Sequence, residues 1–156
     1  MNDEAYMRVA IATAQEGIAT GQTPFGACLV QADRVIACAH NVVWASLDIT
    51  AHAEVQTIRN ACAALKTIDL SGCVLYSTCE PCPMCFSAAH WARLARIVYG
   101  AEIADARQAG FHELTISNLA LKQLGESPVE LTGGLLREEC LALFDAWDKR
   151  PDKRIY

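Results

Sequence analysis

The sequence predicts an α/β protein in which helices cover both faces of a central five-stranded mixed sheet, giving three layers. Two kinds of segment alternate along the chain. Some are short and either apolar throughout or alternately apolar and polar, as is typical of strands, and in the others apolar residues recur every three to four positions, as in amphipathic helices. This alternation favours parallel strands after an opening hairpin. With 156 residues, 53% of them hydrophobic and 20% charged, the chain has the length and composition of a single globular domain covering 1–156.

The first part of the chain predicts a helix, a hairpin and a second helix. Residues 3–20 carry apolar positions at helical spacing. The segments 26–31 and 34–40 predict two strands joined by a two-residue turn. From 51 to 66 an apolar stripe predicts an amphipathic helix. The members of that stripe are Val55, Ile58, Cys62 and Leu65.

The second part alternates strands with helices. Residues 73–78 and 96–100 predict buried strands, and the helix expected between them at 82–93 is apolar on most sides. A helix at 113–124 and a short strand at 129–132 follow. A last apolar stripe predicts the final helix and consists of Leu136, Cys140, Leu143, Phe144 and Trp147.

Charge and composition argue against several functional classes. Lysine and arginine number 13 and the acidic residues 18, so the formal net charge is −5. Domains that bind nucleic acid usually have a basic balance, and the one basic cluster here lies in the tail at 149–154. The chain shows neither a secretory signal nor an apolar stretch able to span a bilayer. We expect a cytoplasmic protein that contacts no membrane and no nucleic acid.

Three of the eight cysteines are evenly spaced in the stretch T-C-E-P-C-P-M-C at 78–85. In a reducing compartment, clustered cysteines more often bind metal or react than form disulfides. The clustered residues are Cys79, Cys82 and Cys85. The other five lie in apolar runs and are interpreted as small core residues. They are Cys28, Cys38, Cys62, Cys73 and Cys140.

Cys82 and Cys85 are candidate metal ligands together with His52. Residues three apart share a helix face, so both thiols should point the same way. Pro83 is tolerated in a first helical turn, and a helix N-terminus favours a thiolate. His52 opens the helix at 51–66 on its buried face. Three nitrogen and sulfur ligands at two helix starts predict a zinc ion, Zn²⁺.

Cys79 distinguishes two kinds of zinc site. If it joined, the set of three cysteines and one histidine would be a closed structural site; without it, the fourth position stays open, as in catalytic sites. Pro81 favours an extended or turning Glu80, so Cys79 should end a strand while Cys82 begins a helix. We therefore expect Cys79 to stay outside the ligand set. An iron–sulfur cluster would need a further cysteine at position 89, which is alanine.

Glu54, two residues after His52, favours catalysis over a structural role. A hydrolytic zinc site needs a group that moves protons, and a structural site does not. A capping box requires Ser or Thr three residues before the acid, where the chain has Ala51. A favourable interaction with the helix dipole remains open, but it explains neither the histidine nor the cysteines. Glu54 is therefore the predicted catalytic residue.

The H-A-E at 52–54 and the P-C-P-M-C at 81–85 together match the H-x-E…P-C-x-x-C signature of zinc-dependent nucleobase deaminases. Over nearly its whole length the chain resembles the cytidine deaminase superfamily, and within it the guanine deaminase branch. The closer resemblance rests on P-F-G-A (24–27), T-A-H-A-E-V-Q-T-I-R (50–59), C-E-P-C-P-M-C-F-S-A (79–88), A-G-F-H-E (109–113) and the terminal Tyr156. Plant guanosine deaminases share these features.

The resemblance implies a cytidine-deaminase-like fold and a zinc-dependent hydrolase acting on a small purine, most simply guanine, to give xanthine and ammonia. Zinc would activate water and Glu54 would carry the protons. The branch usually has Asp where this chain has His112. Glu113 still supplies a carboxylate there, and we interpret His112 as a solvated loop residue.

Candidate substrate contacts come from both the topology and the resemblance. They are Phe25, Asn41, Ala51, Phe111, Glu113 and Tyr156. Asn41 ends the second strand at the edge where the helices begin, and its amide can donate and accept, although it could equally be a turn residue. Phe25 could stack on a base or belong to the core, and Ala51 would contribute backbone groups. Phe111 and Glu113 are expected in the loop after the fourth strand.

Other substrates and one other class remain as alternatives. Guanosine, cytosine or adenosine in tRNA could replace guanine, although tRNA would require basic residues near the site. A zinc-stapled binding module without catalysis is the alternative from a different class, and ligation by Cys79 would support it. The apolar helix at 82–93, which carries Trp91, favours self-association, so we expect a homodimer.

Overall fold

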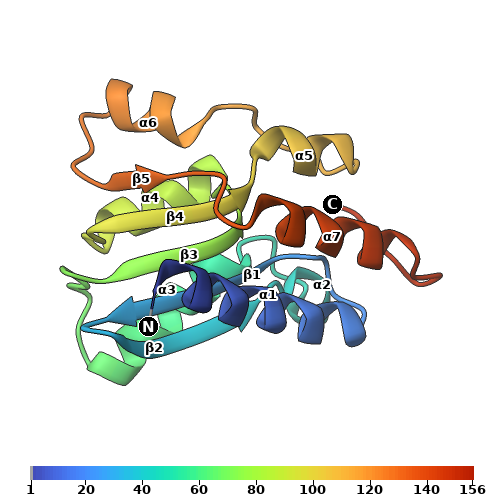
Figure 1. The fold of residues 1–156 in the computed structure, drawn as a ribbon, viewed down its shortest axis with the longest axis horizontal. Helices are drawn as coiled ribbons and strands as arrows, with labels where there is room; N and C mark the ends of the chain where they lie inside the picture. The colour runs from blue at the N-terminus through green and yellow to red at the C-terminus, as the bar shows by residue number, and fades with distance from the viewer. Residues whose placement is uncertain (1) are drawn as a thin grey trace.

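A computed structural model describes residues 2–156 and has three layers, with a five-stranded sheet in the middle (Figure 1). The strand order is β2-β1-β3-β4-β5. The bounds are Gly26–Gln31 for β1, Arg34–His40 for β2, Val74–Cys79 for β3, Arg96–Ala101 for β4 and Glu130–Thr132 for β5. β1 is antiparallel to β2 and β3, whereas β3, β4 and β5 are parallel. The predicted mixed sheet is confirmed.

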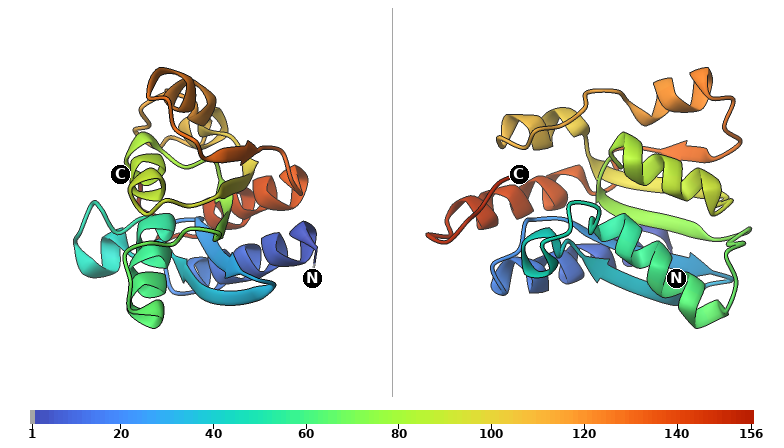
Figure 2. Two further views of the ribbon diagram at one scale, coloured as in Figure 1. Left: turned by 90° about the vertical axis from the view of Figure 1, so that its left-hand side faces the viewer. Right: turned by 180° about the vertical axis from the view of Figure 1, so that it is seen from behind.

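The described residues form seven helices. They are α1 (Asp3–Ala19), α2 (Val43–Ser46), α3 (Ala53–Leu65), α4 (Pro83–Trp91), α5 (Ile103–Gln108), α6 (Asn118–Leu124) and α7 (Arg137–Asp148). Helices α1 and α7 cover one face of the sheet and α3 and α4 the other, which the view from behind in Figure 2 brings to the front. No helix within residues 2–156 has the length and apolar character needed to cross a membrane.

Each face of the sheet has its own hydrophobic core. Successive side chains of a strand point to opposite faces, so β1 contributes to both cores. Cys28 packs in the cluster that contains Met7 of α1, while Leu29 packs in the cluster that contains Phe86 of α4. Both β1 residues are fully buried. This two-sided burial explains why β1 is apolar almost throughout.

Three details of the predicted helices are wrong. The short helices α2 and α5 were not predicted, and the helix expected at 113–124 begins only at Asn118. Ser117 ends the extended stretch because its hydroxyl accepts a hydrogen bond from the Ala120 N–H at 3.1 Å, an ordinary N-cap. Phe111 and Glu113 consequently lie in the segment between α5 and α6, not directly after β4.

The candidate site residues lie along the edge of the sheet that is formed by the strand ends. β2 ends at this edge and β1 begins there, because Gly26 pairs with His40. β3 and β4 also end there, with Cys79 beside Ala101. Helices α3 and α4 start at the same edge. In sheets with parallel strands, ligands bind at the carboxyl ends of those strands.

Candidate metal centre and substrate cavity

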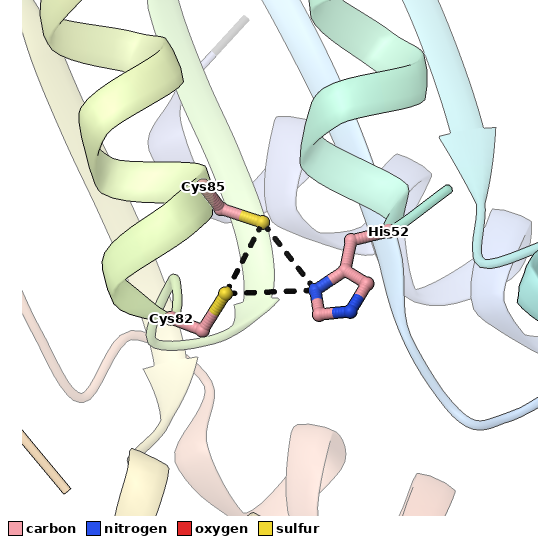
Figure 3. Close-up of side chains that lie close together, drawn as sticks. All are labelled: His52, Cys82 and Cys85. Atoms are coloured by element: carbon pink, nitrogen blue, oxygen red, sulfur yellow. Dashed lines mark hydrogen bonds between the residues drawn. The ribbon is translucent and has the colours of Figure 1, made fainter. Parts of the chain in front are cut away.

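His52 and Cys82 occupy equivalent places, each immediately before the first turn of its helix. His52 is the N-cap of α3 and Cys82 the N-cap of α4, and both have extended backbones. Neither side chain makes a capping hydrogen bond to its own helix. The imidazole and the thiol therefore face each other across the gap between the helix starts, and Cys85, one turn into α4, joins them (Figure 3).

The three ligand atoms form a nearly regular triangle. His52 Nδ1 lies 3.6 Å from Cys82 Sγ and 3.5 Å from Cys85 Sγ, and the two sulfurs are 3.6 Å apart. Zinc–sulfur bonds of about 2.3 Å and zinc–nitrogen bonds of about 2.0–2.1 Å at tetrahedral angles require separations of about 3.5–3.8 Å. The triangle thus fits one face of a zinc tetrahedron and leaves a fourth position for water or substrate.

Cys79 lies close to the centre but outside the triangle. Within the described part of the chain, the cluster of possible ligand atoms consists of His52, Cys82 and Cys85. The Cys79 thiol instead donates to the backbone carbonyl of Glu102, at 3.5 Å. Its place at the end of β3 holds it against the wall of the cavity.

The electrostatics favour a thiolate at Cys82. Its hydrogen bond with Cys85, assisted by His52, outweighs burial and lowers the pKa of Cys82 to about 4. Zinc binds the deprotonated form of cysteine, so a thiolate at neutral pH suits a metal ligand.

Glu54 lies in the first turn of α3 with its carboxyl group turned into the centre. Its side chain is almost fully buried, and its Oε1 accepts from the Ser77 hydroxyl at 3.2 Å. Its Oε2 accepts from the Cys85 thiol at 3.5 Å. Burial, together with the charge of Cys82, raises the pKa of Glu54 above its usual range. A carboxyl group with a raised pKa beside the metal cluster is suited to general acid–base catalysis.

A narrow cavity opens beside Glu54. Its lining residues are Phe25, Asn41, His52, Glu54, Cys79, Glu80, Cys82, Glu113 and Tyr156. It adjoins a wider pocket of about 280 Å³ that shares His52, Cys82, Glu113 and Tyr156 and adds Phe111 and His112. The structure thus brings the metal cluster, Glu54 and five of the six candidate substrate contacts to one place.

Asn41 and Tyr156 close one side of this cavity. Asn41 is buried, and its Nδ2 donates to the Tyr156 hydroxyl at 2.6 Å while its Oδ1 accepts from the Val43 N–H at 3.0 Å. The Tyr156 ring lies 5.5 Å from the His52 ring. The last residue of the chain therefore folds back over the metal ligands of the same chain.

The aromatic candidates pack on one another. The rings of Phe25 and Phe111 are 4.9 Å apart in an edge-to-face arrangement, and Phe111 lies 5.4 Å from Tyr156. Phe111 is buried, whereas His112 is exposed, in agreement with its interpretation as a solvated residue.

Ala51 differs from the other candidates. Its N–H donates to Asp48 and its carbonyl accepts from Val42, so both backbone groups are engaged within the chain. It is buried and is absent from the residues that line the cavity. Ala51 directly precedes His52 in the chain but does not lie at the cavity surface.

Glu113 supplies a second carboxyl group to the cavity. Its side chain is half-buried, and burial, with the charge of Cys82, raises its pKa to about 7. Sequence reasoning missed two other buried polar groups, the Ser77 hydroxyl on Glu54 and the side chain of Glu80. The alternation of β3 places Ser77 and Cys79 on one face, which was the only available signal for Ser77.

A metal centre of one imidazole and two thiols, a buried acid beside it and an adjoining cavity define a hydrolytic zinc enzyme. Residues 1–101 match the model of the cytidine and deoxycytidylate deaminase zinc-binding region. The chain belongs to this deaminase family, whose members are hydrolases acting on carbon–nitrogen bonds. Its cofactor is zinc.

The relatives include two kinds of deaminase. The chain is 41% identical to a guanine deaminase of Bacillus subtilis over 157 residues, covering all of both chains. It is 37% identical to a tRNA-specific adenosine deaminase of the same species, covering 97% of this chain and 92% of the relative. The solved guanine deaminase from Nitrosomonas europaea superposes with a TM-score of 0.87 at 30% identity, covering 96% of this chain and 86% of the other.

Proposed function

We propose that this chain deaminates guanine hydrolytically to xanthine and ammonia. The observation that carries the proposal is the buried carboxyl group of Glu54, which hydrogen-bonds Cys85 within the metal cluster. The full-length similarity to a guanine deaminase supports guanine as the base. His52, Cys82 and Cys85 are the proposed zinc ligands.

Glu54 is the proposed proton carrier. A zinc ion held by the three ligands supplies Lewis acidity, which lets water act as a nucleophile near neutral pH. Glu54 takes a proton from the attacking water and passes it to a ring nitrogen of the base. It then takes the remaining proton from the hydroxyl of the tetrahedral adduct and delivers it to the amine as the carbon–nitrogen bond breaks and the carbonyl forms, so one water is consumed and one ammonia released.

The proposed substrate contacts surround the space next to Glu54. The Asn41 amide offers a donor and an acceptor to the base edge, and Phe25 and Phe111 present rings for packing. Glu113 accepts a hydrogen bond from an amine or ring N–H of the base. Tyr156 covers the base. The Asn41 amide, which donates to the Tyr156 hydroxyl in the structure, donates to the substrate instead when the base is bound.

The second candidate substrate, adenosine in tRNA, is supported by the 37% identical relative. Charge argues against it. In the basic tail, Arg150 pairs with Asp152, Lys153 pairs with Asp148, and Arg154 lies over the Trp44 ring. Arg150 and Lys153, whose charges are neutralised by acidic residues of their own chain, contribute less to binding phosphates.

Ammonia release from a panel of substrates tests the proposal. The panel holds guanine, guanosine, adenine, cytosine, cytidine and an anticodon stem-loop with adenosine at the wobble position. We expect guanine to be turned over with the highest kcat/KM. Turnover of cytosine with guanine and guanosine both inert would refute the assignment, and preference for the stem-loop would favour the second candidate.

We propose that the protein acts as a homodimer. Trp91 at the end of α4 is 83% exposed and Ile68 is 84% exposed, and both border an open groove on the α4 side of the molecule. Large exposed apolar side chains gathered in this way are typical of subunit contacts. Light scattering should give twice the chain mass of 16.9 kDa, and Trp91→Glu should give the monomer.

We also propose a cytoplasmic location. All eight cysteines are free thiols, and thiol-rich proteins without disulfides are typical of reducing compartments. Cell fractionation followed by detection of the tagged protein tests this assignment.

A further inference from the structure

Glu80 is a buried carboxylate beside the metal ligands that the proposed reaction does not use. It lies between the end of β3 and Cys82, and the residue is only 7% exposed. Its Oε2 accepts a hydrogen bond from the Ile103 N–H at 3.2 Å, and its Oε1 accepts one from the Asn118 N–H at 2.7 Å. Both oxygens are therefore engaged by backbone groups.

These two N–H groups belong to the first residues of α5 and α6. The first N–H groups of a helix have no partner within it, and buried ones need an acceptor from elsewhere. Hydrogen bonds to a charged acceptor are stronger than neutral ones. A single carboxylate thus fixes the starts of two helices that lie 15 residues apart in the chain, at Ile103 and Asn118.

A third hydrogen bond joins the same parts of the chain. Asn118 is fully buried, and its Nδ2 donates to the backbone carbonyl of Pro81 at 2.6 Å. The dipeptide at 80–81, which leads into Cys82, is therefore tied to the start of α5, one short helix before the segment, and to the start of α6, directly after it. These three hydrogen bonds link the position of that segment to the position of the loop before Cys82.

The segment at 109–117 carries Phe111 and Glu113, and much of the rest of it is exposed. Its own backbone hydrogen bonds are local, such as Glu113 N–H to Phe111 and Ile116 N–H to Leu114. In addition, the His112 N–H donates to the carbonyl of Tyr156, and the buried Phe111 ring packs against Phe25 and Tyr156. The hydrogen bonds of Ile103 and Asn118 connect the stretch that contains this segment to residues 80–81, directly before Cys82.

We propose that Glu80 is a positioning residue for substrate binding: its carboxylate holds the 109–117 segment so that Phe111 and Glu113 face the metal centre. Glu80 acts through this segment, because each of its oxygens accepts a hydrogen bond from the first residue of a helix that flanks it. The activity measurements below rest on the proposed guanine deaminase function, whereas the exchange measurement does not.

Loosening the anchor affects binding more than chemistry. When only a fraction of molecules has the binding-competent segment, the apparent affinity falls by that fraction. Bound substrate then restores the ordered segment, so turnover at saturation is preserved. The zinc ligands come from the starts of α3 and α4 and keep their places. The expected signature is a raised KM with kcat and zinc content little changed.

The test compares Glu80→Gln with wild type and with the matched control Glu102→Gln. Glutamine keeps the size of the side chain, but only one of its two terminal atoms accepts hydrogen bonds. Glu102 is the exposed N-cap of the same helix α5, and Glu102→Gln removes the same charge, keeps a side-chain oxygen that can accept from the first turn of α5, and leaves α6 untouched. We measure KM and kcat for guanine, zinc content, and amide hydrogen exchange over 109–117.

We expect Glu80→Gln to raise KM about tenfold or more, as loss of a hydrogen bond to a charged group does. Exchange over 109–117 should quicken by a similar factor, with kcat within about threefold and zinc retained. Glu102→Gln should match wild type in all four. Asn118→Ala, which removes the tie to Pro81 alone, should shift KM and exchange in the same direction by less, and it replaces Glu80→Gln if that variant does not fold.

Two results would overturn the proposal. One is unchanged KM and unchanged exchange in Glu80→Gln. The other is loss of zinc and kcat with exchange over 109–117 unaltered, which would assign Glu80 to the metal loop. If the wild type releases no ammonia from guanine, the proposed function fails, and the exchange measurement alone decides whether Glu80 positions the segment.

Discussion

Glu54 and Cys79 show how position, not residue type, sets the role of a side chain at this site. Glu54 is held inside by Ser77 and Cys85, in contact with the metal cluster. Cys79 has the same thiol as the two ligand cysteines, but its sulfur is directed at the carbonyl of Glu102. Substitutions of Glu54 and of the cysteines should therefore separate proton transfer from metal binding.

Glu54→Gln should lower kcat on guanine by about 10²–10⁴-fold, the usual contribution of a general acid–base group. The amide keeps the size of the side chain but cannot carry the proton. Zinc content should stay at the wild-type level, since His52, Cys82 and Cys85 are intact. Ammonia release and metal analysis on the same sample check both expectations, and unchanged turnover would remove Glu54 from the mechanism.

Cys85→Ser and Cys79→Ser form a matched pair that tests the ligand set. Cys85→Ser should weaken zinc binding by more than about 100-fold, because even changes outside the ligand set cost 10- to 100-fold. Cys79→Ser should bind zinc as wild type does. In cobalt-substituted protein, the thiolate absorption should indicate two thiolates for wild type and Cys79→Ser and one for Cys85→Ser. A third thiolate in wild type would contradict the open site.

The close fit of α1 against the sheet depends on the absence of a side chain at one position. A Cβ at Gly26, the first residue of β1, would lie 2.4 Å from the Ala10 carbonyl oxygen and 2.6 Å from the Ala14 nitrogen. Both are backbone atoms of α1, so the whole helix would have to move. Phe25 and Gly26 are neighbours, so this contact also sets the position of one cavity wall.

Gly26→Ala should therefore reduce the free energy of unfolding by about 1–3 kcal/mol, the usual cost of overpacking. Urea unfolding followed by circular dichroism measures it, and an unchanged midpoint would mean that α1 adapts without cost.

A second contact between elements gives a pH-dependent prediction. Asp3, at the start of α1, accepts hydrogen bonds from the Tyr76 hydroxyl at 2.7 Å and from Arg96 at 2.8 Å, on β3 and β4. The hydrogen bond from Tyr76 and then that from Arg96 hold the pKa of Asp3 below its usual value of 3.8. A carboxyl group with a lowered folded-state pKa stabilises the fold above the unfolded-state pKa and loses that contribution as the pH falls.

Asp3→Asn should accordingly be less stable than wild type at pH 6 by up to about 1 kcal/mol, a modest value because the pair is partly exposed. The difference should shrink as the pH falls below about 4, where wild type also becomes protonated. Urea midpoints of both proteins across this range provide the measurement. A difference that stays constant with pH would show that the carboxylate charge is not involved.

At the scale of the whole molecule, the metal connects helices that are far apart in the sequence. Its proposed ligands begin α3 and α4, which pack on the same face of the sheet. Zinc that binds the folded chain alone stabilises it by about 4 kcal/mol at a free concentration 1,000 times its Kd. For a domain of this size, that corresponds to roughly 8–16 °C in Tm.

Removal of zinc with a chelator should thus lower Tm by several degrees, and added zinc should restore it. Differential scanning calorimetry with and without chelator gives the shift. The Cys85→Ser variant serves as the control, because its Tm should respond little to chelator. An equal response of both proteins would place the stabilising metal elsewhere.

The sequence alone predicted the strands and the cluster of possible metal ligands, because both depend on spacing over a few residues. Periodicity gave β1, β2 and β4 nearly to the residue, and the pairing of H-A-E with P-C-P-M-C predicted zinc and Glu54. Pro81 separated Cys79 from Cys82 by local backbone preference. Local rules fail where a contact joins distant parts of the chain.

The tertiary structure decided the remaining features for that reason. Ile103 and Asn118, the first residues of α5 and α6, donate hydrogen bonds to the Glu80 carboxylate, 23 and 38 residues away in sequence. The placement of Tyr156 over the cavity depends on Asn41, 115 residues earlier. Hydrogen bonds of this range leave no periodic trace in the sequence, because each links one residue to a partner that only the folded chain brings near. Short sequence motifs thus predicted the chemistry of the site, whereas the fold decided which residues line the proposed substrate cavity.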